Sequence, residues 1–341
     1  DLFQKDSKKA VSAKILKRFS GVLERQTALL PVRSAMLAAT SMVFLGSAFS
    51  TSAQVAGNQY WTGDPLWNNI DTTWKDTSQQ IDVWGGGSAT FADIPGVPNK
   101  TVSLTENISV QNLYFRNGGF QLSGPHTINF PKNYSVIEVD DGTATIATRV
   151  EANGVIKKKG QGTLVLEGAS IGGQISLWEL ESGTLHLADS SALFSSNSFV
   201  FNGGHLKIGN GRVSGSSIAT HFSFWPGITN IDIQSNIDYG VTVNSAAGKL
   251  IKDGLGSLNF LSLRPVTGQF NGADINNGIL RTPMDYFSPT SIINVAGILE
   301  VNNFADQNYS GTINRQYNVN TNDYGRVVRV LLKKVFNEQF A

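Results

Sequence analysis

The sequence predicts an all-β solenoid, a fold in which short strands wind around one elongated core. Three observations predict it. Short runs of alternating apolar and polar residues fill the chain from Gly57 onward, where helical periodicity is almost absent. Gly and Asn residues separate these runs. A strand–turn–strand motif also returns after 93 to 95 residues.

The alternating runs predict strands with one buried face. Successive side chains of an extended strand point to opposite sides, so apolar residues at every second position face the core together. The pattern occurs at residues 101–105, 108–110, 112–115, 120–122, 127–130 and 136–139. Their spacing of about 7 to 10 residues would also suit a β-sandwich, so alternation alone leaves both folds open.

Glycine and asparagine residues predict tight turns between the strands. Both residue types tolerate a positive φ angle, which most tight turns between short strands require. The predicted turns are Asn117-Gly118-Gly119, Asp141-Gly142, Asn153-Gly154, Asn202-Gly203-Gly204 and Asn277-Gly278.

An internal repeat favours the solenoid over the sandwich. The motif Lys-x-Gly-x-Gly-x-Leu occurs twice, and two Gly-x-Leu elements follow each copy. Units that recur in this way each bury a face against the next unit, which is the physical basis of solenoid proteins. The first copy comprises residues 158–164, 183–185 and 204–206, and the second comprises residues 252–258, 278–280 and 297–299.

The motif resembles the autotransporter-associated β-strand repeat of bacterial passenger domains, with residues 156–187 as one copy and 251–282 as the other. The Trp-rich stretch upstream resembles the leader that often precedes such repeats, so the resemblance covers most of residues 57–300. It implies a right-handed parallel β-helix. Coils of roughly 20–25 residues, stacked about 4.8 Å apart, would give about a dozen coils.

Residues 1–53 have the organisation of an extended signal peptide. Eight Lys and Arg residues precede the apolar run 34–50, and small residues that suit a cleavage site end at Ala53. The apolar run is shorter than the roughly 20 residues that a membrane span needs. Removal of this segment leaves 19 basic and 23 acidic residues, a net charge of −4. No basic surface remains that would favour a nucleic-acid partner.

The chain contains no cysteine, so burial and hydrogen bonds must hold an exported fold together. We divide the chain into the signal peptide 1–53, a Trp-rich N-terminal cap region 54–100, β-helix repeats 101–325 and an amphipathic tail 326–341. The tail could form a short C-terminal helix that caps the last coil, or a strand, because its apolar residues suit one helical face. These residues are Val327, Val328, Leu331, Leu332, Val335 and Phe336.

Four tryptophans are the candidate binding residues. They could stack on sugar rings if they were exposed, or they could close the N-terminal end of the solenoid, whose open core and edge strands need a cap. We expect the cap, because four indole rings bring a large apolar surface. The four residues are Trp61, Trp67, Trp74 and Trp84.

The acidic residues Glu138, Asp140 and Asp141 could form a calcium site or a catalytic pair. Adjacent acids in a strand point to opposite faces, however, and Asp141-Gly142 reads better as a turn. No histidine pair has the spacing of metal ligands, so we expect solvated or groove-lining roles for His126, His186, His205 and His221. The sequence therefore predicts no catalytic residue, no metal site and no cofactor.

The sequence predicts a structural or adhesive passenger of autotransporter type, without enzyme activity, exported to the outer-membrane surface or the extracellular space. Host or matrix surface molecules or glycans would be its partners, and the signal peptide would engage the export machinery. Repeat signals persist past residue 300, so we expect no translocator barrel in this chain. A carbohydrate-active β-helix enzyme and a glycan-binding module are the alternatives.

Overall fold

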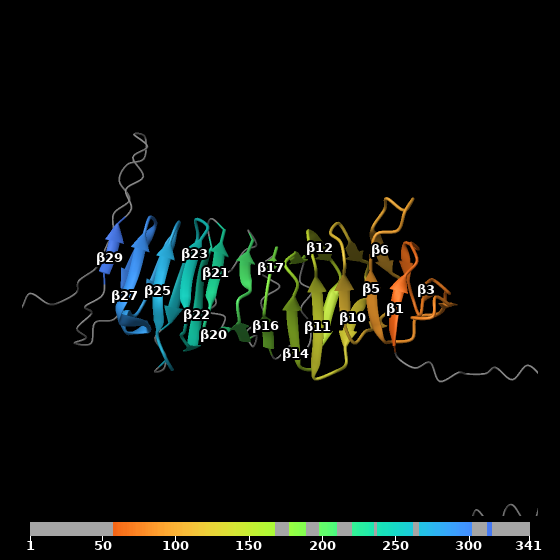
Figure 1. Cartoon of the computed structure of the whole chain (residues 1–341), viewed down its shortest axis with the longest axis horizontal. Helices are drawn as coiled ribbons and strands as arrows, with labels where there is room; N and C mark the ends of the chain where they lie inside the picture. The colour runs from red at the N-terminus through yellow and green to blue at the C-terminus, as the bar shows by residue number, and fades with distance from the viewer. Residues whose placement is uncertain are drawn as a thin grey trace, which may run out of the picture. The chain divides into compact units, whose positions relative to one another are not determined.

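The computed structural model describes residues 57–167, 177–188, 198–209, 220–234, 237–261, 266–301 and 312–315. Within these residues, strands dominate, and one short 3-10 helix spans Met284–Tyr286. The predicted signal peptide and the predicted tail helix lie outside the described residues. Two long sheets and one short sheet contain the strands, and β1 and β29 lie at opposite ends of the stack (Figure 1).

The longest sheet, sheet A, has 14 strands among the described residues. Its parallel strands, in stacking order, are β1 (Asn58–Trp61), β5 (Ser88–Phe91), β8 (Leu113–Phe115), β11 (Tyr134–Val139), β14 (Val155–Lys159), β16 (Leu177–Leu180), β18 (Ser198–Phe201), β20 (Thr220–Phe224), β22 (Asp238–Ser245), β24 (Ser257–Leu261), β26 (Ile279–Thr282) and β28 (Ile298–Val301). Two antiparallel strands, β3 (Trp74–Lys75) and β4 (Ile81–Asp82), extend it beyond β1.

In the part of the chain that the structure describes, sheet B has 12 strands and sheet C has three. Sheet B contains β2 (Leu66–Trp67), β6 (Thr101–Leu104), β9 (Gln121–Ser123), β12 (Thr143–Ile146), β15 (Thr163–Leu166), β17 (Thr184–Leu187), β19 (His205–Ile208), β21 (Ile228–Ile233), β23 (Lys249–Asp253), β25 (Phe270–Ile275), β27 (Phe287–Val295) and β29 (Thr312–Arg315). Sheet C contains β7 (Ile108–Ser109), β10 (Thr127–Phe130) and β13 (Arg149–Ala152).

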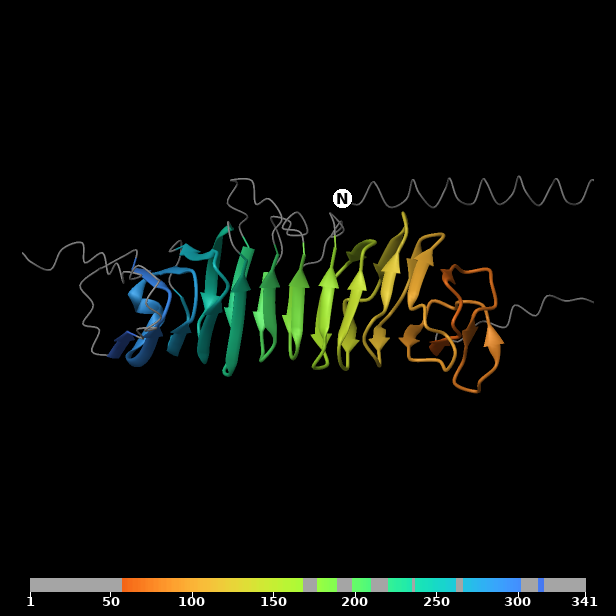
Figure 2. The same cartoon turned by 90° about the horizontal axis from the view of Figure 1, so that it is seen from above.

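The strands form a parallel β-solenoid, which confirms the predicted fold class. The chain passes repeatedly from sheet A to sheet B, with the strands of sheet C between them in three coils. Apart from β3 and β4, the strands pair in parallel with the strand one coil away (Figure 2). Between β8 and β28, paired residues of sheet A are 19 to 24 positions apart, as in Leu113↔Ile137 and Ile279↔Ile298. Each coil therefore uses about the number of residues that the sequence predicts.

Alternate residues of each strand point into one continuous core. In β14, Ile156 and Lys158 are buried, whereas Lys157 and Lys159 lie on the outer face. Side chains of successive coils stack on one another, and the rings of Phe201 and other phenylalanines form part of the stack. This inward–outward alternation is what the period-two pattern predicts.

Glycines at the corners allow successive turns to approach closely. Gly183 has a φ of +63°, which L side chains rarely adopt. A Cβ atom at this position would lie 2.3 Å from the carbonyl oxygen of Gly160 and 2.4 Å from that of Gly162. The Gly-x-Gly and Gly-x-Leu elements of the repeat therefore stack directly on each other, and a side chain at Gly183 would separate the coils.

The two copies of the repeat lie at different corners of the solenoid. Lys158 belongs to β14 of sheet A, whereas Lys252 belongs to β23 of sheet B. Strand pairing in sheet B leads from Leu164 of β15 through four successive coils to Lys252. Lys252 therefore stacks in the row of Leu164 and not in the row of Lys158. The repeat distance is thus not a whole number of coils, and the same motif forms the turn from sheet A to sheet B in one copy and the turn from sheet B to sheet A in the other.

Candidate functional site

The four candidate tryptophans pack together at the N-terminal end. Their exposed fractions are 5% for Trp61, 0% for Trp67 and Trp74, and 3% for Trp84. Trp67 is central: its ring centroid lies 5.0 Å from that of Trp74, 5.1 Å from that of Trp84 and 5.5 Å from that of Phe91. A ring that stacks on a sugar must expose a face, so this burial favours the role of a cap.

Trp225 is the exposed tryptophan that sequence reasoning missed. All six tryptophans are described, and Trp225 is 48% exposed whereas the other five are buried. It begins the turn at residues 225–227 between β20 and β21, and these three residues and Ile228, the first residue of β21, are all exposed. The Pro-Gly pair in this turn was the available signal, because such pairs mark corners at the surface.

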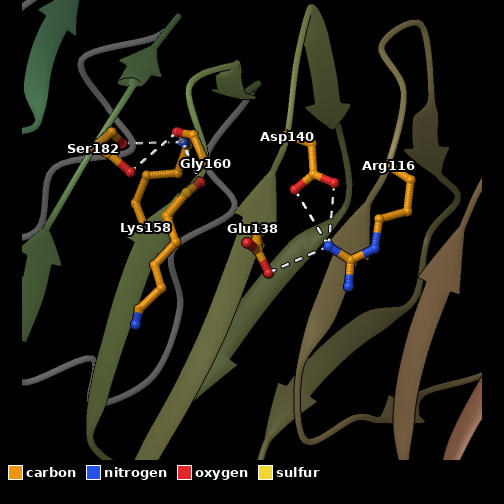
Figure 3. A network of polar contacts seen from close by, with 7 residues as sticks. Arg116, Glu138, Asp140, Lys158, Gly160 and Ser182 are labelled. Carbon is orange, nitrogen blue, oxygen red and sulfur yellow. Dashed lines mark hydrogen bonds and ion pairs between the residues drawn. The ribbon is translucent and has the colours of Figure 1, made fainter.

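Ion pairs between neighbouring coils cover the outer face of sheet A near the first repeat copy. The Arg116 guanidinium lies 3.2 Å from an Asp140 oxygen and 3.5 Å from a Glu138 oxygen (Figure 3). Further along the sheet, the Lys157 ammonium lies 2.9 Å from Glu179 and 3.0 Å from Glu181.

The sign of the charge therefore alternates from β8 to β16, coil by coil. Partial burial opposes the ionisation of Glu181, but hydrogen bonds from Lys159 and Lys157 outweigh it and lower the pKa of this carboxyl. Hydrogen bonds to Glu179 and Glu181 raise the pKa of Lys157. A general acid at neutral pH needs a raised carboxyl pKa instead, so these residues suit a structural charge ladder.

The acidic residues singled out from the sequence separate into two roles. Glu138 and Asp140 belong to the charge ladder, whereas Asp141 lies in the turn between β11 and β12. Gly142 has a φ of +60° there, which confirms the predicted turn. Sequence reasoning missed Arg116, which lies 24 residues before Asp140 and so one coil away.

Polar side chains on the outer face of sheet B form a second ladder. The Asn294 amide donates to Asp274 at 2.8 Å, and the Asn314 amide donates to Asn294 at 3.1 Å. On this face, His205 accepts a hydrogen bond at Nδ1 from the backbone N–H of Asn230, and burial lowers its pKa. Within the described residues, no three His or acidic side chains gather to hold a metal, and no helix could cross a membrane.

Within the described ranges, two lysines are fully buried at the corners, and both come from the repeat motif. The Lys158 Nζ donates to the carbonyl oxygens of Lys159, Gly160 and Ser182 at 2.6, 3.0 and 3.3 Å (Figure 3). In the second copy, the Lys252 Nζ donates to the carbonyl oxygens of Asp253, Gly254 and Asn277 at 2.5, 2.9 and 3.4 Å.

These lysines predict a rise in stability at alkaline pH. Burial lowers the pKa of both Lys158 and Lys252 to about 8, from an ordinary value of 10.5. Between these values the unfolded chain binds more protons than the folded chain, so folding becomes more favourable as pH rises from about 8 toward 10.5. The gain is on the order of 3 kcal/mol for each lysine, and it is lost again as pH falls through 8.

Urea unfolding of the full chain from pH 7.5 to 10 would test this effect. Chains with Lys158→Met and Lys252→Met are the control, because they keep the apolar volume without the titrating group. We expect a rising midpoint for the natural sequence and a flatter profile for the double variant. Parallel profiles for the two proteins would contradict the prediction.

Comparisons with known proteins show a sequence similarity to a curated autotransporter. No protein-family model matches the chain, and no solved structure matches it. The chain is 24% identical over 262 residues to the Adhesin BmaC autotransporter of Brucella suis biovar 1 (strain 1330). It resembles an autotransporter passenger in both sequence and fold. The match includes 67% of this chain, and the chain spans 7% of the length of that relative.

Proposed function

We propose that this passenger-like chain is an adhesive segment of an autotransporter, displayed at the outer-membrane surface or released from it. The similarity to an autotransporter adhesin over 67% of the chain carries this proposal. The parallel solenoid supports it, because stacked coils present long, regular outer faces and corners to a partner. Host or matrix surface molecules, including glycans, are the proposed partners, and no catalytic reaction is assigned.

The paired charges on the outer faces favour a structural role over an active site. On sheet A, each carboxylate of the charge ladder faces a Lys or Arg of a neighbouring coil, as in Arg116 with Asp140 and Lys157 with Glu179. Paired charges on adjacent coils favour the parallel register, whereas a β-helix hydrolase needs carboxylates whose environments push their pKa values apart. The ladder thus supports an organising role for these residues.

Adhesion of coated particles would test the proposed function. Beads that carry the full chain should adhere to cultured epithelial cells and to immobilised matrix proteins or glycosaminoglycans more than beads that carry albumin. A Gly183→Ala chain, in which coil stacking is disturbed, is the control for folded structure. Binding no stronger than that of albumin across these surfaces would contradict the adhesive role.

The exposed turn at Trp225 is our predicted contact for such adhesion. Trp225 and Ile228 expose 48% and 54% of their surface, and aromatic residues are enriched among those that dominate binding. We expect Trp225→Ala to weaken bead adhesion by roughly tenfold or more while the fold is retained. Ile292→Ala, at a similarly exposed position on β27, is the matched control. Equal adhesion of the two variants would remove Trp225 from the proposed contact.

A further inference from the structure

Two corners of the solenoid each enclose a lysine ammonium among main-chain carbonyl oxygens. An ammonium group carries three N–H donors and no acceptor, and three carbonyl oxygens surround the Nζ atom at both corners. Two of the three belong to the lysine's own turn. The third belongs to the next coil, at Ser182 for Lys158 and at Asn277 for Lys252.

The residues above and below each lysine show that apolar side chains fit these inward positions. Lys158 is in register with Ile137 of the preceding coil and Leu180 of the following coil. Lys252 is likewise in register with Ile231 and Ile275. A leucine or isoleucine could therefore fill the volume, and the carbonyl oxygens are the feature that an apolar residue would leave without a donor.

An acidic residue lies at the same position relative to each lysine, directly after the lysine's register partner in the preceding coil. Glu138 follows Ile137, the register partner of Lys158, and its charge acts on the Lys158 ammonium. Asp232 follows Ile231 and acts in the same way on Lys252. Since the two corners belong to different sheets, the shared arrangement arises from the local motif and not from one particular place in the solenoid.

We propose that each repeat corner is a binding site for a primary ammonium group, and that the lysine is a tethered ligand that latches one coil's turn to the next. Two carbonyl oxygens of the turn and one of the following coil form the site. The hydrogen bond to the following coil forms only when the two neighbouring turns are in the correct register. The proposal concerns the repeat itself and is independent of the adhesive function.

Chemical rescue in the full chain would test the ligand class. Lys158→Ala removes the side-chain atoms that n-propylammonium resembles and leaves the carbonyl oxygens in place. At pH 7, where both the lysine and the added amine carry three N–H donors, we expect the urea midpoint to fall in this variant and to rise again with n-propylammonium chloride. Tetramethylammonium chloride at the same concentration has the same charge without N–H donors, so it should leave the midpoint unchanged.

Leu180→Ala is the matched control, because it opens an apolar cavity one coil away on the same inward row. The rescue should be absent there. Equal responses of Lys158→Ala to both cations, or an equal response of Leu180→Ala to n-propylammonium, would overturn the proposal.

Amine acylation of the natural sequence gives a second test that needs no variant. Lys157 and Lys159 flank Lys158 in the same strand and expose 26% and 40% of their side chains. With an amine-reactive ester and mass spectrometry, we expect Lys158 and Lys252 to react roughly tenfold or more slowly than Lys159. Reaction of the buried pair at the rate of Lys159 would show that their ammonium groups are not held at the corners, and would refute the latch.

Discussion

Gly183→Ala is expected to destabilise the solenoid by about 4 kcal/mol, through two separate costs. The native φ of +63° strains any L side chain, which costs roughly 1–2 kcal/mol. The added Cβ atom would also lie within 2.4 Å of the carbonyl oxygens of Gly160 and Gly162 in the preceding turn. Backbone atoms cannot swing aside as the end of a side chain can, so the coils must separate.

Gly96→Ala distinguishes these costs. Gly96 also has a positive φ, of +83°, but no atom lies within 4 Å of a Cβ built there. We expect this variant to lose only about 1–2 kcal/mol. Urea unfolding of both variants, with hydrogen exchange of the turn at residues 182–184, measures the difference. Equal losses would mean that backbone conformation, and not the close stacking of turns, limits what position 183 accepts.

Trp67→Ala is expected to cost about 3–5 kcal/mol, because it removes the largest kind of side chain from a fully buried position. Three aromatic neighbours surround the ring, and none can fill the space without leaving its own contacts. The variant would loosen the N-terminal cluster and expose the edges at β2 and β4. Unpaired edges template association with other chains, so we also expect more aggregation.

Trp225→Ala is the matched control for this loss, since it deletes the same atoms at a position that is 48% exposed. We expect its unfolding midpoint to stay close to that of the natural sequence, within about 0.5 kcal/mol. Tryptophan fluorescence during urea unfolding, with light scattering for aggregation, measures both variants. A loss in Trp225→Ala as large as that in Trp67→Ala would show that burial in the N-terminal cluster is not what makes Trp67 important.

Local pattern was sufficient to predict much of the fold. The alternation in residues 101–104 predicts a strand with Val102 and Leu104 inside, and β6 has this arrangement. The turn at Asp141-Gly142 was also predictable, because a positive φ is a property of the residue type and its immediate neighbours. The internal repeat then indicated that the strand–turn–strand units stack, because a single unit cannot bury its apolar face by itself.

Properties that depend on register were not predictable. Arg116 meets Asp140 because 24 residues complete one coil at that point, whereas other coils of sheet A take as few as 19. Such differences come from the loops and bulges of each coil. No local pattern reports them, so the charge ladder on sheet A appears only when the strands are paired.

The sequence by itself determined the residue types at the corners, the alternation of the strands and the presence of a repeat. Only the tertiary structure decided that Lys158 and Lys252 occupy opposite corners, that both ammonium groups face carbonyl oxygens, and that Trp225 is exposed while Trp67 is buried. The physical reason is that turn geometry and strand periodicity are local, whereas burial and ammonium contacts depend on which coil lies above and below. Those neighbours are about twenty residues away along the chain, and the lengths of all the strands and turns in between set which residues pair.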